Sequence, residues 1–350
     1  MSAARWMRRL AVAGVLLCFT VVVLGAYVRL TAAGLGCPDW PGCYGHLTPP
    51  DAAAGPTELG LAAQAAYAAR PLEAGKAWRE MIHRYAAGAL GVVILLITAL
   101  AVTSRRERLA SVPFALALLL TVIVQAILGM LTVTWQLKPL IVVAHLVFGL
   151  TTLGLLWWLT LSLPRGSWGA TALSSAGRTI SGGGASPLAN AHRLATLGLV
   201  ALAVQIALGG WTSSNYAALA CPDFPTCQGS WWPHADFRDA FVLWRGLDID
   251  YEGGVLDHPA RIAIHLTHRL GALIAAVALA LAAGFVLRNR GLSGARTRAW
   301  AVFAALALQL AIGVTMVVKA FPLGLTTAHT AGAALLLLAT LALLRSTSAR

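Results

Sequence analysis

The chain has 350 residues, of which 58% are hydrophobic and only 11% charged, and this composition excludes an ordinary soluble domain. Its formal net charge of +13 would suggest nucleic acid as the partner of a soluble protein. Here apolar segments of membrane-spanning length recur along the whole chain, so we expect a lipid bilayer as its surroundings and no nucleic acid as a partner.

Eight apolar segments are long enough to cross a hydrocarbon core about 30 Å thick, which takes about 20 residues. They lie near residues 9–29, 81–103, 111–134, 138–162, 193–213, 261–286, 298–319 and 325–344. The first follows three arginines, as a signal sequence would, but its apolar run is longer than usual for one. Since further spans follow, we expect it to remain as the first helix.

The basic residues are distributed unevenly between the two sides that these spans define. Fifteen of the 26 lysines and arginines fall on the side of the termini, where the only acidic residue is Glu107. The positive-inside rule therefore predicts that the N- and C-termini are cytoplasmic. Two long loops, near residues 30–78 and 214–260, then lie outside, and residues 57–70 of the first loop read either as a short amphipathic helix or as a solvated loop.

The sequence also repeats itself. Residues 37–43 (CPDWPGC) are matched by residues 221–227 (CPDFPTC), and residues 125–129 (QAILG) by residues 309–313 (QLAIG), at an offset of 184 residues. Because an even number of spans separates the two copies, the repeat is parallel, with its axis along the membrane normal. The predicted fold is therefore an all-α polytopic membrane protein, with eight transmembrane helices forming two pseudo-symmetric four-helix bundles.

The repeat predicts the boundaries of two halves. The N-terminal half spans residues 1–164 and the C-terminal half spans residues 191–350. Residues 165–190 between them are rich in Gly, Ser and Ala, which is typical of a flexible connection, here on the cytoplasmic side.

Four histidines fall within predicted spans: His83 and His145, with their repeat counterparts His268 and His329. Ionisable residues inside a membrane are costly and mark functional sites by default. Each pair lies at a similar depth, about 10 Å from the outer surface at 1.5 Å per residue, which suits two axial ligands of a planar metallo-macrocycle. We predict that both pairs bind haem iron; helix-to-helix hydrogen bonding and a bare metal or proton relay are the alternatives.

Charged residues beside these histidines differ between the halves. Arg84 and Arg269 directly follow a ligand candidate, where a guanidinium group can bind haem propionates or reach lipid headgroups. Glu80 stands one helical turn before His83, at the position that His265 occupies in the other half. The N-terminal half thus presents a carboxylate that can act as a general base, unless Glu80 only pairs with a neighbouring arginine. The role of His265 stays open.

The cysteines of the outer loops form two matched pairs, Cys37 with Cys43 and Cys221 with Cys227. An oxidising outer compartment allows such pairs to form disulfides, which is the reading we favour. Redox-active thiols and copper or zinc binding are the alternatives. Cys18 lies within the first span and reads as an inert small hydrophobe.

Taken together, these features resemble one family, haem A synthase, over essentially the whole chain. The resemblance rests on residues 34–41 (GLGCPDWP), on residues 80–84 (EMIHR), on the paired His145 and His329, and on the duplicated eight-helix plan. It implies an oxidoreductase of the bacterial inner membrane. Such an enzyme oxidises the C8 methyl group of haem O to a formyl group and so makes haem A for cytochrome oxidase.

The resemblance also implies roles for individual residues. The substrate haem O is expected in the N-terminal half, bound by His83, His145 and Arg84, with Glu80 catalytic. A resident haem b is expected in the C-terminal half, and both haem sites face the periplasmic side. The resemblance implies His268 and His329 as the iron ligands of haem b, Cys37–Cys43 as the functionally relevant disulfide, and Cys221–Cys227 as the structural one.

The expected partners are haem O synthase, which supplies the substrate, and an electron acceptor that the sequence does not identify; a homo-oligomer is compatible with the sequence. The main alternative is a dihaem b-type membrane cytochrome that only transfers electrons. That reading explains nearly every feature except Glu80 and the difference between the halves. A transporter would explain the repeat but would not need two regular histidine pairs.

Overall fold

The structure, a computed structural model, describes residues 3–50, 57–66, 71–104, 110–163 and 186–348. Within these residues the regular structure is helical, apart from two isolated β-bridges. Eight of the described helices are long and apolar enough to cross a membrane. The all-α fold class with eight spans is thereby confirmed.

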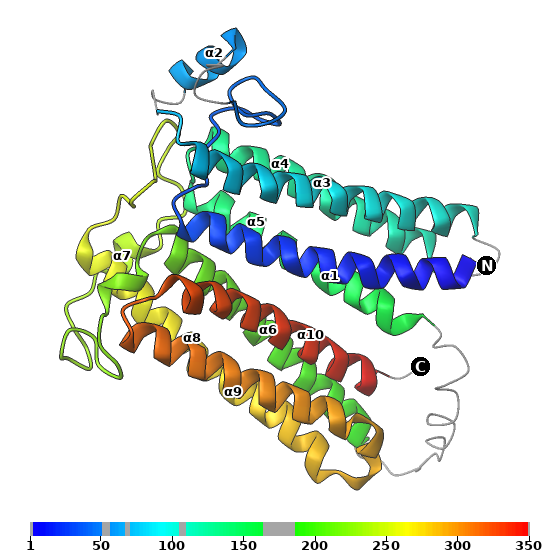
Figure 1. Ribbon diagram of the computed structural model, residues 1–350. Coiled ribbons are helices and arrows are strands. Elements are labelled where there is room, and N and C mark those ends of the chain that lie inside the picture. The colour runs from blue at the N-terminus through cyan, green and yellow to red at the C-terminus, as the bar shows by residue number, and fades with distance from the viewer. Residues whose placement is uncertain (1–2, 51–56, 67–70, 105–109, 164–185, 349–350) are drawn as a thin grey trace.

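The long helices run alongside one another in a bundle (Figure 1). They are α1 (Ala3–Leu30), α3 (Ala74–Thr103), α4 (Val112–Thr134), α5 (Pro139–Ser162), α6 (Pro187–Ser214), α8 (His258–Arg288), α9 (Arg296–Val318) and α10 (Leu323–Thr347). The shorter elements are α2 (Glu58–Ala66), η2 (Ala218–Ala220), α7 (Phe237–Ala240) and η3 (Arg290–Ala295). The helical reading of residues 57–70 is confirmed for α2, while residues 67–70 lie outside the described part of the chain.

Several helices extend past the predicted spans, because hydropathy marks only the part of a helix that hydrocarbon covers. α3 begins at Ala74, about two turns before the predicted span. α6 begins at Pro187, directly after the capping side chain of Ser186. Its first turn therefore falls within the predicted linker, of which residues 165–185 lie outside the described residues.

Each half of the chain forms its own set of neighbouring helices. In the N-terminal half α3 and α5 both pack against α1 and against α4, and in the C-terminal half α8 and α10 both pack against α6 and against α9. The halves meet where α1 packs on α10 and α5 packs on α6 and α10. Figure 1 accordingly shows α3 and α4 on one side of the bundle and α8 and α9 on the other.

Polar contacts also join the halves. Arg29 Nη2 on α1 donates a hydrogen bond of 2.8 Å to the carbonyl of Ser213 on α6, and its guanidinium carbon lies 4.1 Å from the ring centroid of Tyr216. Trp157 Nε1 on α5 donates a bond of 2.9 Å to the carbonyl of Leu338 on α10. The two halves therefore form one bundle with a shared interior.

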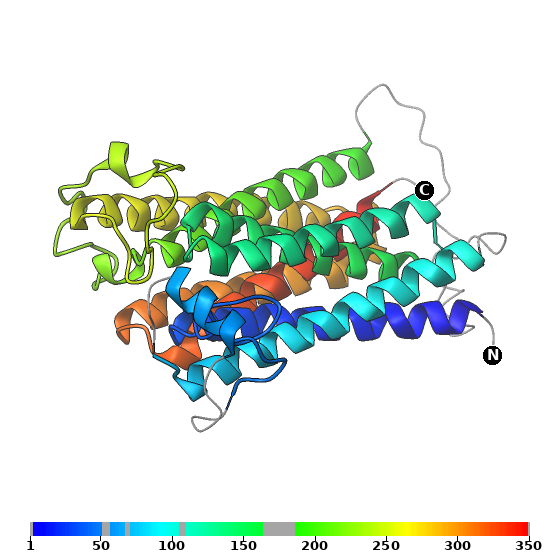
Figure 2. The same cartoon turned by 90° about the horizontal axis from the view of Figure 1, so that it is seen from above.

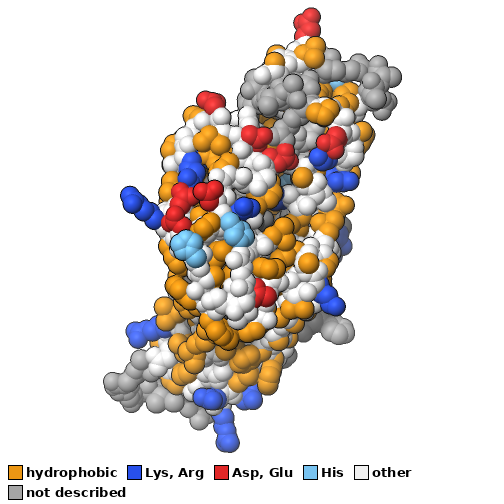
Figure 3. Space-filling model, turned by 90° about the vertical axis from the view of Figure 1, so that its left-hand side faces the viewer, with side chains coloured by type: hydrophobic (Ala, Val, Ile, Leu, Met, Phe, Trp, Pro, Cys, Tyr) orange, Lys and Arg blue, Asp and Glu red, His pale blue; other side chains and the backbone are white. Residues whose placement is uncertain are grey.

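The outer loops and the short helices α2 and α7 gather at one end of this bundle, opposite the start of α1 and the end of α10 (Figures 1 and 2). Figure 3 looks onto that end and shows acidic side chains gathered on it. The loop end thus brings together segments that are far apart in the chain.

Candidate functional site

The structure places one predicted histidine pair in each half of the bundle. His83 lies on α3 and His145 on α5, and His268 lies on α8 and His329 on α10. All four side chains lie between helices and are only partly exposed. One pair therefore lies within each half of the bundle, on two helices that both pack against the first helix of that half.

A glycine of a neighbouring helix lies against each imidazole. A Cβ atom at Gly25 would lie 3.0 Å from Cε1 of His83, and one at Gly129 would lie 3.2 Å from Cε1 of His145. The C-terminal half repeats this arrangement at 3.1 Å, with Gly209 against His268 and Gly313 against His329. Any larger residue would displace the ring, so these glycines define where each imidazole can lie.

Sequence reasoning identified the repeat that contains Gly129 and Gly313 but did not assign these glycines a role, and it missed Gly25 and Gly209. The signal was present, since both pairs of glycines are 184 residues apart. Its meaning depends on which helices lie side by side, and that emerges only from the fold.

The surroundings of the histidines suit haem. Nδ1 of His83 and of His145 is buried and has no hydrogen-bond partner among the described residues. In the same part of the chain, no three His, Cys, Asp or Glu side chains come close enough to hold a metal ion by themselves. Two imidazoles are what a bis-histidine haem requires, because the macrocycle supplies the other four ligands. Haem ligation by these residues stays a prediction.

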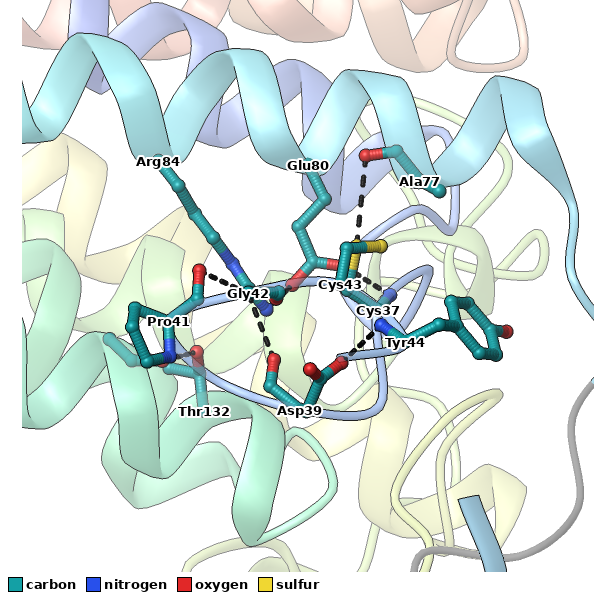
Figure 4. A network of polar contacts seen from close by, with 11 residues as sticks. Cys37, Asp39, Pro41, Gly42, Cys43, Tyr44, Ala77, Glu80, Arg84 and Thr132 are labelled. Atoms are coloured by element: carbon teal, nitrogen blue, oxygen red, sulfur yellow. Dashed lines mark hydrogen bonds and ion pairs between the residues drawn. A yellow bond between two sulfur atoms is a disulfide. The ribbon is translucent and has the colours of Figure 1, made fainter. Parts of the chain in front are cut away.

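Glu80 stands one helical turn before His83 on α3, and its side chain points toward the first outer loop (Figure 4). Its side chain is buried, with 4% of the residue surface exposed. Oε2 accepts a hydrogen bond of 2.9 Å from the amide of Cys37, and Oε1 accepts one of 2.5 Å from Arg84 Nη2. The pairing with arginine is therefore present, and a loop amide adds to it.

Arg84 holds the same loop from the helix side. Its Nη1 donates hydrogen bonds of 2.9 Å to the carbonyl of Asp39 and 2.6 Å to the carbonyl of Gly42. The carboxylate of Asp39 folds the loop from within, because it accepts bonds of 2.6 Å and 2.8 Å from the amides of Tyr44 and Gly45. A haem propionate would have to use the remaining N–H groups of Arg84, and that role stays a prediction.

An arginine holds the second outer loop in the same way, but a histidine stands there at the position of Glu80. Arg269 donates hydrogen bonds to the carbonyls of Thr226 at 2.7 Å and Asp223 at 2.8 Å. His265 occupies the position of Glu80; it is 4% exposed, and its ring lies edge-on to Phe321 with centroids 6.4 Å apart. The difference between the halves predicted from Glu80 and His265 is thus a difference in buried polar groups beside the two sites.

Both pairs of outer-loop cysteines form disulfides, Cys37 with Cys43 and Cys221 with Cys227, as the favoured reading of their spacing predicted. Cys18 is free and buried in α1. The first disulfide closes the loop whose amide contacts Glu80, so this cysteine pair is part of the environment of the candidate site.

Comparison with known proteins shows which family this chain is similar to. Residues 8–341 match the family model COX15-CtaA, described as cytochrome oxidase assembly protein. A Shewanella oneidensis protein named heme A synthase is 40% identical over 334 residues, which cover 95% of this chain and 93% of that protein. A protein of the same name from Caulobacter vibrioides is 30% identical, with 91% of this chain and 89% of that protein covered. The corresponding protein of Paracoccus denitrificans is 29% identical, with 89% and 80% covered.

Proposed function

Because the chain belongs to the COX15-CtaA family of cytochrome oxidase assembly proteins, we propose that it is a haem A synthase. It converts haem O to haem A by oxidising the C8 methyl group of haem O to a formyl group. The observation that carries this proposal is the 40% identity, over 95% of the chain, to a protein named heme A synthase. The buried carboxylate beside one histidine pair supports it.

The two histidine pairs have different tasks in this proposal. His83 and His145 bind the substrate haem O, and His268 with His329 hold a resident haem b. A bound haem b supplies one-electron transfer, which carries electrons away from the oxidised substrate. The support for this division is that Glu80, which contacts Arg84, stands beside the first pair, while the second pair has the imidazole of His265 at that position.

Glu80 is the proton acceptor in this proposal. Oxidation of a methyl group to a formyl group releases protons, and a positioned carboxylate can take one of them. The amide of Cys37 and the guanidinium of Arg84 orient the carboxylate, since each occupies one of its oxygens. Arg84 thereby acts on Glu80 as well as on the propionate that it is proposed to bind.

The setting of the enzyme follows from its charge distribution. We propose the bacterial inner membrane as its location, with cytoplasmic termini and haem sites toward the periplasm, because basic residues cluster on the side of the termini. Haem O synthase is the proposed supplier of substrate, an electron acceptor of unidentified nature receives the electrons, and a homo-oligomer remains a prediction.

The test is a product analysis. The chain is expressed together with haem O synthase in a host that makes no haem A, and the haems are extracted in acid solvent and separated by chromatography with mass detection. Haem A or its alcohol intermediate is the expected product. Haem b alone, in folded protein that was given haem O, would overturn the proposal in favour of an electron-transferring cytochrome.

A further inference from the structure

Three of the four glycines that lie against the histidines are preceded by a glutamine four residues earlier. They are Gly129, Gly209 and Gly313, preceded by Gln125, Gln205 and Gln309. Residues four apart on a helix share a face, so each glutamine lies on the helix face that its glycine presents to the imidazole. In α1 the corresponding position before Gly25 is Val21, and His83 is therefore the one of the four predicted ligands without a glutamine at this position.

The glutamines contact their histidines directly in the C-terminal half. Gln205 Nε2 lies 3.0 Å from Nδ1 of His268 and also donates a bond of 3.0 Å to the carbonyl of that residue. Gln309 Nε2 lies 3.3 Å from Nδ1 of His329. Both imidazoles of the pair predicted to hold haem b thus have a side-chain amide at the ring. The amide lies nearer to Nδ1 than to Nε2 in His268, and at 3.3 Å from both nitrogens in His329.

In the N-terminal half neither imidazole has an amide within hydrogen-bond distance of its ring among the described residues, but one of the two histidines is held by a glutamine through its backbone. Gln125 Nε2 donates a bond of 2.8 Å to the carbonyl of His145. His83 has Val21 in place of a glutamine, and its Nδ1, like that of His145, is buried without a partner among the described residues.

The side-chain oxygen of each of the three glutamines is available to accept a hydrogen bond. Oε1 of Gln125, Gln205 and Gln309 is buried and lacks a hydrogen-bond partner in the described part of the chain. The two ends of a carboxamide exchange by a half-turn about its last bond. An imidazole that binds iron through Nε2 carries a proton on Nδ1, and a turned carboxamide can accept it, which fixes the ring and makes it a stronger ligand. For Gln125 and Gln205 this bond would replace the bond to the histidine carbonyl.

We propose that Gln125, Gln205 and Gln309 are positioning residues that fix three haem ligands, and that Val21 leaves His83 as the displaceable ligand of the substrate haem. This inference rests on the proposed function. The substrate haem must enter its site and its product must leave, whereas the resident haem stays. A site with one fixed and one displaceable imidazole permits that exchange, and a site with two fixed imidazoles resists it.

The experiment measures carbon monoxide binding to the purified, dithionite-reduced full chain loaded with haem O, because carbon monoxide replaces only an axial ligand that yields. In the unmodified protein we expect binding at the N-terminal haem alone. Val21→Gln supplies the missing amide and should weaken carbon monoxide binding about tenfold or more. Val21→Leu adds comparable bulk without an amide and should leave the affinity as it was.

The reciprocal change tests the other half. Gln205→Leu removes an amide from His268 and should make the resident haem b reactive toward carbon monoxide as well. This variant decides the matter if Val21→Gln fails to accumulate in the membrane. Unchanged carbon monoxide affinity in both Val21→Gln and Gln205→Leu, in protein that retains both haems, would overturn the inference alone. Protein that never retains haem O or haem A in the haem assay would instead overturn the proposed function.

Discussion

Both oxygens of the Glu80 carboxylate accept hydrogen bonds, one from the backbone of a loop and one from a side chain of its own helix. The donors are the amide of Cys37 and the guanidinium of Arg84. A buried carboxylate needs such partners, because an ion without them would be costly at this depth. The same two contacts orient the group toward the place where it is proposed to accept a proton.

Replacing this carboxylate should separate binding from chemistry. Glu80→Gln keeps the size of the side chain but cannot accept a proton, so we expect haem A production to fall about 10²- to 10⁴-fold while haem is retained. Haem extraction with mass detection measures the product, and the absorption spectrum measures retention. The control is Glu73→Gln, which removes an exposed charge that pairs with Lys76 at 2.8 Å and should leave both quantities unchanged. Normal haem A production by Glu80→Gln would show that Glu80 is not the base.

Asp223 in the second outer loop should confer a pH dependence on that loop. Hydrogen bonds from the Thr226 hydroxyl and from the amides of Gly229 and Gln228 lower the pKa of Asp223 from 3.8 to about 2. Since the pKa is lower in the folded chain, the ionised group stabilises the loop above about pH 4, and this contribution is lost as the pH falls toward 2. Acidification over that range should therefore loosen the loop.

The loop can be followed through its disulfide. We expect the rate at which a phosphine reduces Cys221–Cys227, relative to the Asp223→Asn variant, to be low above pH 4 and to approach that of the variant near pH 2. Asp248→Asn, in the same outer segment, should behave like the unmodified chain. A constant ratio between the unmodified chain and Asp223→Asn across this range would contradict the prediction.

At this scale, the sequence revealed the polar members of the site but not their contacts. The histidines, Glu80 and the cysteines were predicted because charge inside a span and repeated spacing are visible along the chain. The contact of Arg84 with the carbonyls of Asp39 and Gly42 was not predicted, since carbonyl groups carry no sequence signal and the loop must first fold back onto α3.

Between helices, the glycines set how closely two elements approach at each predicted haem site. α1 approaches α3 at Gly25, α4 approaches α5 at Gly129, and the C-terminal half repeats both contacts. Small residues at helix crossings in membranes allow the backbones to come close, and here the space is taken by an imidazole of the partner helix. The position of each predicted ligand is therefore set by the neighbouring helix as well as by its own.

A large side chain at one of these positions should expel the imidazole. Gly209→Leu would place four carbons where a Cβ alone already lies 3.1 Å from Cε1 of His268, so we expect the purified protein to lose most of its haem b. The haem-to-protein ratio measures this. The matched control is Gly284→Leu on α8, where a Cβ meets no atom within 4 Å, and it should retain haem. Full haem content in Gly209→Leu would mean that His268 is not a ligand.

The spans themselves were predictable because a bilayer imposes a length and a composition on every helix that crosses it. The ends of the helices were less predictable. α3 and α6 begin before the predicted spans, where polar residues continue the helix outside the hydrocarbon. The short helix α7 carries no hydropathy signal at all; it depends on the side chain of Asp236, which accepts bonds of 2.9 Å and 3.0 Å from Arg238 and Asp239 amides.

For the molecule as a whole, the two halves meet through corresponding positions. Arg29 donates to the carbonyl of Ser213, which is 184 residues further along the chain and hence its counterpart in the repeat. Such a contact follows if equivalent helices face each other across the boundary between the halves. The repeat could be seen in the sequence, but the helices that join the halves could not, because apolar surfaces of similar composition do not specify their partner.

The orientation in the membrane is testable on the intact chain. A fluorescent protein fused after the C-terminus should be fluorescent, and alkaline phosphatase at that position should be inactive, because both results report a cytoplasmic end. Phosphatase inserted at Gly246 in the second outer loop should be active. The opposite pattern of activities would invert the proposed topology and place the haem sites toward the cytoplasm.

The contact between Glu80 and the amide of Cys37 spans 43 residues of chain, and this separation has a consequence for biogenesis. The two groups emerge at different times during synthesis, and the loop must cross the membrane and fold before its amide can meet the carboxylate. A nascent chain that captures haem before that moment holds it without an oriented base. The proposed base is therefore oriented only after the loop has folded onto α3.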